Sequence, residues 1–523
     1  MTEDQRRNLH AQLWKVADEF FGKMNADDYR DYMLGLIFYK YLSEKISLYA
    51  DELLRPDELT FADLANHPQK RDYLAAVKKA TLDKLGYFLL PEDLFDTVAK
   101  NAANDDKLTE NLERILHSIE KSTMGNESEE DFGNLFSGLN LHDIKLGKTV
   151  ADRNKLIARV LGHLDKIDFH LEDSQIDILG DAYEYLIAKF AAGAGKKAGE
   201  FYTPQEVSEI LARIVTHGKT HLRDVYDPTC GSGSLLLRVK KHIGEVDKIY
   251  GQELNNTTYN LARMNMILHD VHYADFDIKQ DDTLERPQHI DQRFEAIVAN
   301  PPFGIKWSAD PIHLSDDRFA PYGRLAPSSK ADYAFITHMI HQLDENGTLA
   351  VVMPHGVLFR GAAEGVIRRF IIEQKNYLDT IIGLPANLFY GTSIPACILV
   401  FKKCRTPEES VLFIDASREF TKGKNQNYLS AKNIDKIIET YAARAEIDKY
   451  SHNASLAEIA ENDFNLNIPR HVDTFEPEPE IDLVAVTAEI KQIDQKSAEV
   501  DAKIAEFCEE LGIEAPWKNK AKR

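Results

Sequence analysis

The sequence predicts an α/β protein built on a doubly wound, mostly parallel, seven-stranded sheet. From about residue 220 onward, short apolar segments alternate with segments of helical periodicity, the pattern of a parallel sheet covered by helices. Two apolar segments end in distinctive turns, one rich in glycine and one reading Asn300-Pro301-Pro302-Phe303. The predicted strands cover residues 225–226, 249–252, 296–298, 349–353, 380–384, 398–401 and 411–414.

Residues 1–165 are predicted to form a helical domain. One amphipathic segment begins near Leu13 and ends near Lys23, and longer ones cover residues 27–48 and 108–119. Their apolar side chains recur three and four residues apart, so we expect them to form a core. No catalytic constellation stands out in this region.

The composition predicts a globular protein of the cytoplasm. Apolar residues make up 43% and charged residues 28% of the chain. No segment approaches the length of a membrane-spanning helix, and the start of the sequence lacks an apolar signal segment. The four cysteines have neither disulfide nor metal-ligand spacing, so we expect no metal.

The net charge of −22 has the wrong sign for a protein that grips DNA unaided. Phosphate contacts require clustered lysine and arginine. If the substrate is DNA, we therefore expect the chain to bind it weakly alone and to rely on a partner for affinity.

The glycine-rich turn predicts a nucleotide site. Asp227 ends a strand, and Gly231, Ser232, Gly233 and Ser234 lead into a helix. The glycines let the backbone pass close to a ligand, and the helix offers unpaired N–H groups. Glu253 ends the next strand, twenty residues after Gly233, where an acidic residue holds ribose hydroxyls in such sites. The alternative for Glu253 is a helix-capping role.

The Asn300-Pro301-Pro302-Phe303 turn predicts a site for a flat base with an exocyclic amine. Consecutive prolines stiffen the loop and keep Asn300 out of the helical region. The Asn300 amide oxygen and the Pro301 carbonyl can accept both amine hydrogens, and Phe303 can stack on the ring. The alternative is a proline-stiffened turn with a core phenylalanine.

Together, these two turns resemble the S-adenosylmethionine-dependent DNA methyltransferases that act on adenine N6. Residues 199–205, 255–265 and 29–45 make the resemblance closer to the methylase (modification) subunit of type I restriction-modification systems. The resemblance implies a Rossmann-like class I methyltransferase core, S-adenosylmethionine as methyl donor, and a flipped adenine in double-stranded DNA. It also implies a specificity subunit, a restriction (motor and nuclease) subunit and a second copy of this chain as partners.

The resemblance carries site roles onto further residues. Asp282 matches the acidic position that meets the cofactor adenine, but Asp281 stands where the family has glycine, which leaves open which carboxylate faces the ligand. The segment that would meet the methionine end of the cofactor consists of Glu200, Phe201, Tyr202, Thr203, Pro204 and Gln205.

A methyltransferase domain is expected over residues 166–472 and a partner-docking helix over 480–523. Apolar residues alternate three and four apart from Leu483 to Leu511, with Ser497 as the polar exception, which predicts a coiled-coil-like helix. The alternative is a helix folded back on its own domain.

Other functions have weaker sequence support. No Pro-Cys nucleophile occurs, which argues against covalent cytosine methylation. Nothing resembles a motor or nuclease, so cleavage would belong to another subunit. The alternatives are an amino-methyltransferase acting on RNA or on protein glutamine, and a scaffold without activity.

Overall fold

Helices dominate the first part of the chain. The computed structural model describes residues 3–20, 23–169, 171, 178–193, 203–389, 393–406, 409–424, 426–474 and 482–515. The helices before the sheet are α1 (Glu3–Asp18), α2 (Ala26–Leu54), α3 (Lys70–Leu85), α4 (Phe95–Asn101), α5 (Leu108–Ser122), α6 (Glu129–Phe132), α7 (Val150–Leu164) and α8 (Ile178–Gly193).

The first helix ends earlier than its amphipathic pattern predicts. After Asp18 the backbone continues in tight turns, in which the Glu19 and Phe20 N–H groups bond to Val16 and Ala17 carbonyls. These turns bury Phe20 completely. The helix therefore ends before the predicted Lys23, and it begins at Glu3, well before the predicted start near Leu13.

The expected mostly parallel sheet is confirmed. Its order is β11-β8-β6-β7-β5-β4-β1-β2-β3, with β7 antiparallel to both neighbours and β11 antiparallel to β8. The strands are β1 (Leu222–Asp227), β2 (Val246–Glu253), β3 (Phe276–Gln280), β4 (Phe294–Ala299), β5 (Leu343–Pro354), β6 (Leu378–Gly383), β7 (Ala396–Lys402), β8 (Val411–Asp415) and β11 (Ser451–Ala454). A separate antiparallel pair joins β9 (Thr421–Lys422) to β10 (Asn427–Tyr428).

Two strands join the seven predicted ones. β3 pairs in parallel with β2 along its whole length and extends one edge of the sheet. β11 reads Ser-His-Asn-Ala, which lacks a β-propensity signal, and it pairs with β8 at the opposite edge. Its strand conformation follows from this edge pairing.

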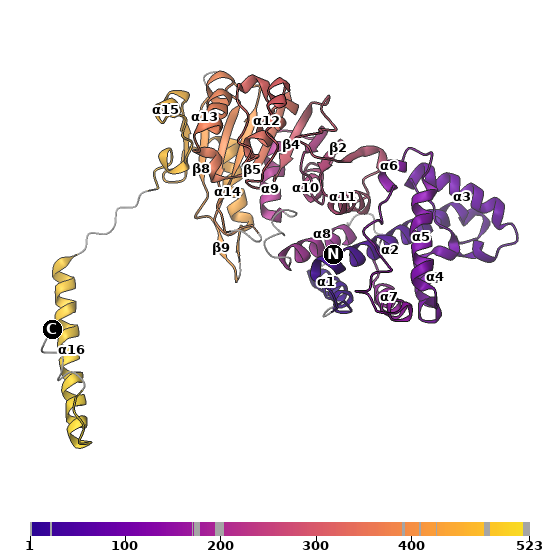
Figure 1. Cartoon of the computed structure of the whole chain (residues 1–523), viewed down its shortest axis with the longest axis horizontal. Coiled ribbons are helices and arrows are strands. Elements are labelled where there is room, and N and C mark those ends of the chain that lie inside the picture. The colour runs from indigo at the N-terminus through magenta and orange to yellow at the C-terminus, as the bar shows by residue number, and fades with distance from the viewer. Residues whose placement is uncertain are drawn as a thin grey trace. The chain divides into compact units, whose positions relative to one another are not determined.

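Helices cover both faces of the sheet, as Figure 1 shows. Successive residues of β4 enter different cores: Ala296 and Val298 join one, and Ile297 and Ala299 join the other. The remaining helices of this region are α9 (Gln205–Val215), α10 (Ser234–Ile243), α11 (Asn256–Leu268), α12 (Asp332–Gln342), α13 (Ala362–Arg369), α14 (Ala431–Ala443) and α15 (Leu456–Glu461).

The two cores differ in extent. Side chains of α9, α10, α11 and α14 share the first core with the N-terminal helices, whereas α12 and α13 contribute to the second. One apolar core thus runs from the N-terminal helices onto a face of the sheet. The division at residues 165 and 166 stays a prediction.

The C-terminal helix belongs to a second compact unit. Contacts divide the chain into Met1–Asp473 and Thr474–Arg523. The second unit contains α16 (Leu483–Glu510), whose N-cap Asp482 accepts bonds from the Val484 and Ala485 N–H groups. Among the described residues, no helix combines the length and apolar character needed to cross a membrane.

Candidate active site

The predicted site residues follow four neighbouring strands that run in the same direction. Asp227 ends β1, Glu253 ends β2, Asp282 follows β3 by two residues, and Asn300 directly follows β4. Because β4, β1, β2 and β3 are parallel, their carboxyl ends share one edge of the sheet. Ligands of open α/β sheets bind at this edge.

Backbone geometry and a neighbouring helix shape the glycine turn. Gly231 and Gly233 have φ angles of 55° and 75°, in the left-handed region that favours glycine. A Cβ at Gly233 would lie 2.7 Å from Met266 Cε. The Asn265 amide donates to the Ser232 carbonyl at 3.0 Å, so α11 supports the turn from behind.

Glu253 connects the end of β2 to this turn. One carboxylate oxygen accepts from the Gly231 N–H at 3.0 Å, and the other accepts from the Asn255 N–H at 2.8 Å. Burial raises the pKa of Glu253, although bonds from backbone N–H groups oppose the shift. Both oxygens keep lone pairs for a further donor such as a hydroxyl.

Asp227 shapes the turn from inside the protein. Its side chain is 2% exposed and accepts from the Thr229 N–H at 2.9 Å and the Thr229 hydroxyl at 3.3 Å. Burial raises the pKa of Asp227 to about 7. These contacts hold the turn and leave little surface for a ligand.

Asp281 and Asp282 differ in their contacts. Arg286 pairs with Asp281 at 2.7 Å, and its hydrogen bonds lower the pKa of that carboxyl. One oxygen of Asp282 accepts from the Leu284 N–H at 2.9 Å and the Glu285 N–H at 3.3 Å. Within the described part of the chain, the other Asp282 oxygen has no hydrogen-bond donor, which favours Asp282 as the ligand-facing carboxylate.

Asn300 carries a buried acceptor. Its amide nitrogen donates to Thr203 Oγ1 at 3.1 Å, which orients the side chain. Its amide oxygen is buried and accepts no hydrogen bond from the described residues. A buried acceptor without a donor is costly, so an amine that fills this position gains a strong contact.

The segment after Asn300 positions a ring. Pro301 is buried, and Phe303 is half-buried with its ring edge-on to Phe389, 6.0 Å between centroids. The Gly304 N–H donates to the Asp332 carboxylate at 2.9 Å, which anchors the end of the turn. Sequence reasoning did not assign Phe389, because an isolated aromatic residue 86 positions beyond Phe303 carries no spacing signal.

The segment predicted to meet the methionine end is described only in part. Glu200, Phe201 and Tyr202 lie outside the described residues. Thr203 meets Asn300 through the bond above. Pro204 caps α9, and Gln205 is exposed at its first turn. The structure therefore joins one residue of this segment to the Asn300 turn.

Comparison with known families identifies the family of the chain. A model of the N-6 DNA methylase family matches residues 174–480, more than half of the chain. The chain belongs to this family. A model of the HsdM N-terminal domain matches residues 9–164.

Individual relatives place the chain among the methylase subunits of type I restriction-modification systems. The MpnII methylase subunit of Mycoplasma pneumoniae is 38% identical, covering 98% of this chain and 97% of its own. The MjaVII methylase subunit of Methanocaldococcus jannaschii is 31% identical over 77% of this chain and 70% of its own. The crystal structure of a type I methyltransferase subunit from Streptococcus thermophilus is 41% identical, with a TM-score of 0.82, covering 90% of this chain and all of that one.

The methylase subunit thus has the class I methyltransferase fold, and its site fits the cofactor of that fold. Glu253 offers carboxylate lone pairs at the strand end, and the Gly231–Gly233 turn brings backbone close to the same place. Asp282 offers an oxygen one strand further along. Hydroxyl and amine groups of a nucleoside would satisfy these acceptors.

Proposed function

We propose that the methylase subunit transfers a methyl group from S-adenosylmethionine to adenine N6 in a DNA sequence chosen by a separate specificity subunit. The observation that carries this proposal is the oriented, buried and unsatisfied amide oxygen of Asn300. An exocyclic amine supplies the donor that this oxygen lacks. The family match and the class I fold support the same reaction.

Asn300 and Pro301 would prepare the nucleophile. The Asn300 amide oxygen and the Pro301 carbonyl each accept one N6 hydrogen. With both hydrogens held, the nitrogen lone pair is directed out of the base plane, where it can attack. When bound, S-adenosylmethionine would supply the electrophilic methyl group and would leave as S-adenosylhomocysteine with the sulfur–carbon electron pair, and N6 would release one of its two protons to solvent. Alignment accounts for most of the acceleration, because no covalent enzyme intermediate is needed.

Phe303 and Phe389 would hold the target base. A base inside duplex DNA cannot reach the sheet edge, so it must leave the stack at a cost of a few kcal/mol. Stacking on Phe303 offsets part of this cost. The edge of Phe389 against Phe303 keeps that ring from rotating away.

The cofactor would lie over the glycine turn. Glu253 is placed to accept ribose hydroxyl hydrogens, and Asp282 to accept from the cofactor adenine. The segment from Glu200 to Gln205, which includes Thr203, is assigned to the methionine end. Asp227 acts through the turn that it stabilises.

DNA affinity and site choice would come from partners. The net charge of −22 opposes unaided DNA binding. The exposed apolar face of α16 is assigned to the specificity subunit, because a coiled-coil seam requires another helix. A restriction subunit that carries motor and nuclease functions and a second methylase copy would complete the complex.

The decisive experiment measures transfer of labelled methyl groups from S-adenosylmethionine to unmethylated DNA, with and without the specificity subunit. We expect N6-methyladenine only when both subunits are present, and loss of product in Asn300→Ala. Asn104→Ala is the matched control, since Asn104 is exposed and distant in sequence from the site. Label in RNA or protein glutamine would contradict the DNA substrate, and intact cofactor binding without any transfer would indicate a scaffold.

A further inference from the structure

A buried arginine joins the segment after β3 to the segment after the Asn300 turn. Arg318 is 2% exposed and follows the 3-10 helix Pro311–Ser315. Its guanidinium donates to the Thr283 carbonyl at 2.9 Å and to the Leu284 carbonyl at 2.8 Å. Asp316 accepts from the same guanidinium at 2.7 Å, so its charge is balanced locally.

The two carbonyls belong to the segment that holds Asp282. Asp282 accepts from the Leu284 N–H, and Arg318 donates to the Leu284 carbonyl. The two side chains therefore bind the backbone of the same residue. The Thr283 hydroxyl donates to the Pro228 carbonyl at 2.6 Å, which links the segment to the glycine turn. Arg318 holds the same segment through the Thr283 and Leu284 carbonyls.

His338 supports Arg318 from α12. Its Nδ1 lies 3.1 Å from Arg318 Nη1 and its Nε2 lies 3.3 Å from Tyr226 Oη. Because guanidinium only donates, Nδ1 accepts and Nε2 carries the proton. Burial, and then the Arg318 charge, hold the pKa of His338 well below its usual value, which keeps the ring neutral. Tyr226 precedes Asp227 on β1, so these contacts reach the start of the glycine turn.

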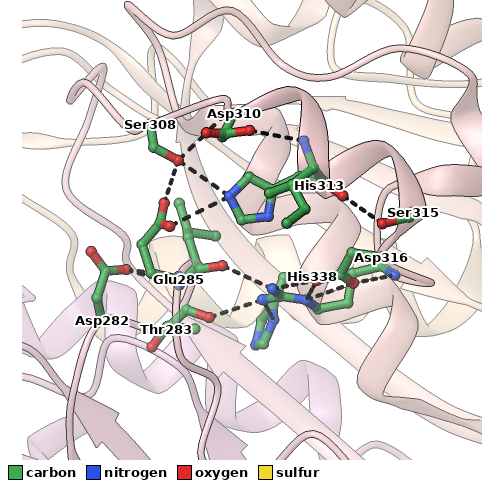
Figure 2. A network of polar contacts seen from close by, with 12 residues as sticks. Asp282, Thr283, Glu285, Ser308, Asp310, His313, Ser315, Asp316 and His338 are labelled. Atoms are coloured by element: carbon green, nitrogen blue, oxygen red, sulfur yellow. Dashed lines mark hydrogen bonds and ion pairs between the residues drawn. The ribbon is translucent and has the colours of Figure 1, made fainter.

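A second group of contacts joins the same two segments nearer the surface. The Ser308 hydroxyl donates to Glu285 at 2.6 Å and lies 3.2 Å from His313 Nε2, which is itself 3.4 Å from Glu285. Figure 2 shows Ser308, Glu285 and His313 converging, with Thr283, Asp316 and His338 at a second meeting point. The long segment after Phe303 is therefore docked on the segment after β3 at two places.

We propose that Arg318 is a positioning residue for the cofactor. It fixes the backbone of Thr283 and Leu284, and so the Asp282 carboxylate, relative to the segment that begins at Asn300. The position of the Asp282 carboxylate then depends on how the segment that begins at Asn300 is folded. This inference rests on the proposed function, since it assigns Asp282 to S-adenosylmethionine.

The test is calorimetric titration of the full chain with S-adenosylmethionine. Arg318→Lys keeps the charge, but it removes the planar guanidinium. A single ammonium group cannot contact both carbonyls and Asp316 at the same time. We expect the Kd to rise about tenfold and, in the methyl-transfer assay with the specificity subunit and DNA, kcat at saturating cofactor to change less than KM. Asp316→Asn, which loosens the guanidinium without removing it, should give a smaller rise in the same direction.

Arg368→Lys is the matched control for loss of a buried guanidinium. Arg368 is 5% exposed and donates to the Phe464 and Val357 carbonyls, away from the segment after β3. Both lysine variants should lower the thermal stability, but only Arg318→Lys should weaken cofactor binding. Equal cofactor affinity in the two variants would overturn the inference.

A double-mutant cycle separates positioning from a general structural effect. Asp282→Asn should weaken binding, and adding Arg318→Lys to it should cause little further loss, because Arg318 acts through Asp282. Additive losses would contradict the inference. A wild-type chain that does not bind S-adenosylmethionine would instead contradict the proposed function. If Arg318→Lys does not fold, Asp316→Asn with Asp282→Asn completes the same cycle.

Discussion

The sheet edge and the C-terminal helix present opposite kinds of groups. At the sheet edge, polar acceptors such as the Asn300 amide oxygen are buried among rigid elements. Along α16 the apolar residues are exposed: Leu483 by 74%, Ile493 by 65% and Phe507 by 62%. A buried acceptor suits a small polar group, whereas an exposed apolar seam suits another protein surface. Under the proposed function, chemistry and assembly belong to separate units, so a change that abolishes one should leave the other intact.

Removing the amide of Asn300 should have the largest effect. We expect Asn300→Ala to lower kcat by about 10²–10³-fold, the usual loss when an oriented group at the reacting atom is deleted. Binding of the specificity subunit, measured by analytical ultracentrifugation, should be unchanged because α16 is intact. Loss of assembly in this variant would contradict the assignment of catalysis and subunit assembly to separate regions.

Changing the helix seam should have the converse effect. Ile490→Asp with Ile493→Asp places charges on exposed apolar positions, and we expect about 10–100-fold weaker binding of the specificity subunit. Gln492→Asp with Gln495→Asp adds the same charges at polar positions of the same turns and is the control. S-adenosylmethionine affinity should stay unchanged in both. Equal binding by the two pairs would instead favour a helix that does not dock through this seam.

The Glu253 carboxylate is expected to contribute to cofactor binding within the first unit. Glu253→Gln has one amide oxygen for the two N–H donors at Gly231 and Asn255, and it loses the charge offered to ribose hydroxyls. We expect about tenfold weaker S-adenosylmethionine binding in calorimetry. Glu245→Gln, at an exposed position just before the same strand, should bind as the wild type does. Unchanged affinity in Glu253→Gln would remove this carboxylate from the cofactor site.

The last prediction concerns the stability of the fold rather than binding or catalysis, through the titration of Asp227 with pH. Its pKa is about 7 in the folded chain, against roughly 4 when unfolded. The folded state thus holds the proton more tightly, so the wild type loses stability as pH rises from about 4 to 7. Asp227→Asn lacks this titration.

Thermal unfolding of the two proteins at pH 5 and pH 8 tests this prediction. The stability of Asp227→Asn relative to the wild type should increase between these pH values. A constant difference would show that Asp227 titrates alike in both states. Comparison with the wild type cancels contributions from other carboxyls, including Asp131, whose pKa burial also raises to about 7.

The sequence alone determined the fold class and several polar positions of the proposed site. Alternating apolar and helical segments specify a parallel sheet, and the turns at Gly231–Gly233 and Asn300–Phe303 mark where its strands end. The apolar seam of α16 could also be predicted from the sequence, because its heptad spacing lies within one helix. Each of these signals is local, and local steric and hydrophobic rules act over only a few residues.

Only the tertiary structure decided which distant residues meet at the site. Phe389 reaches Phe303, Thr203 reaches Asn300, and Arg318 reaches Thr283 across tens of residues. The strand β11 also exists because β8 offers it an edge to pair with. Such contacts depend on how the whole chain packs, and a buried polar group accepts whichever partner that packing supplies.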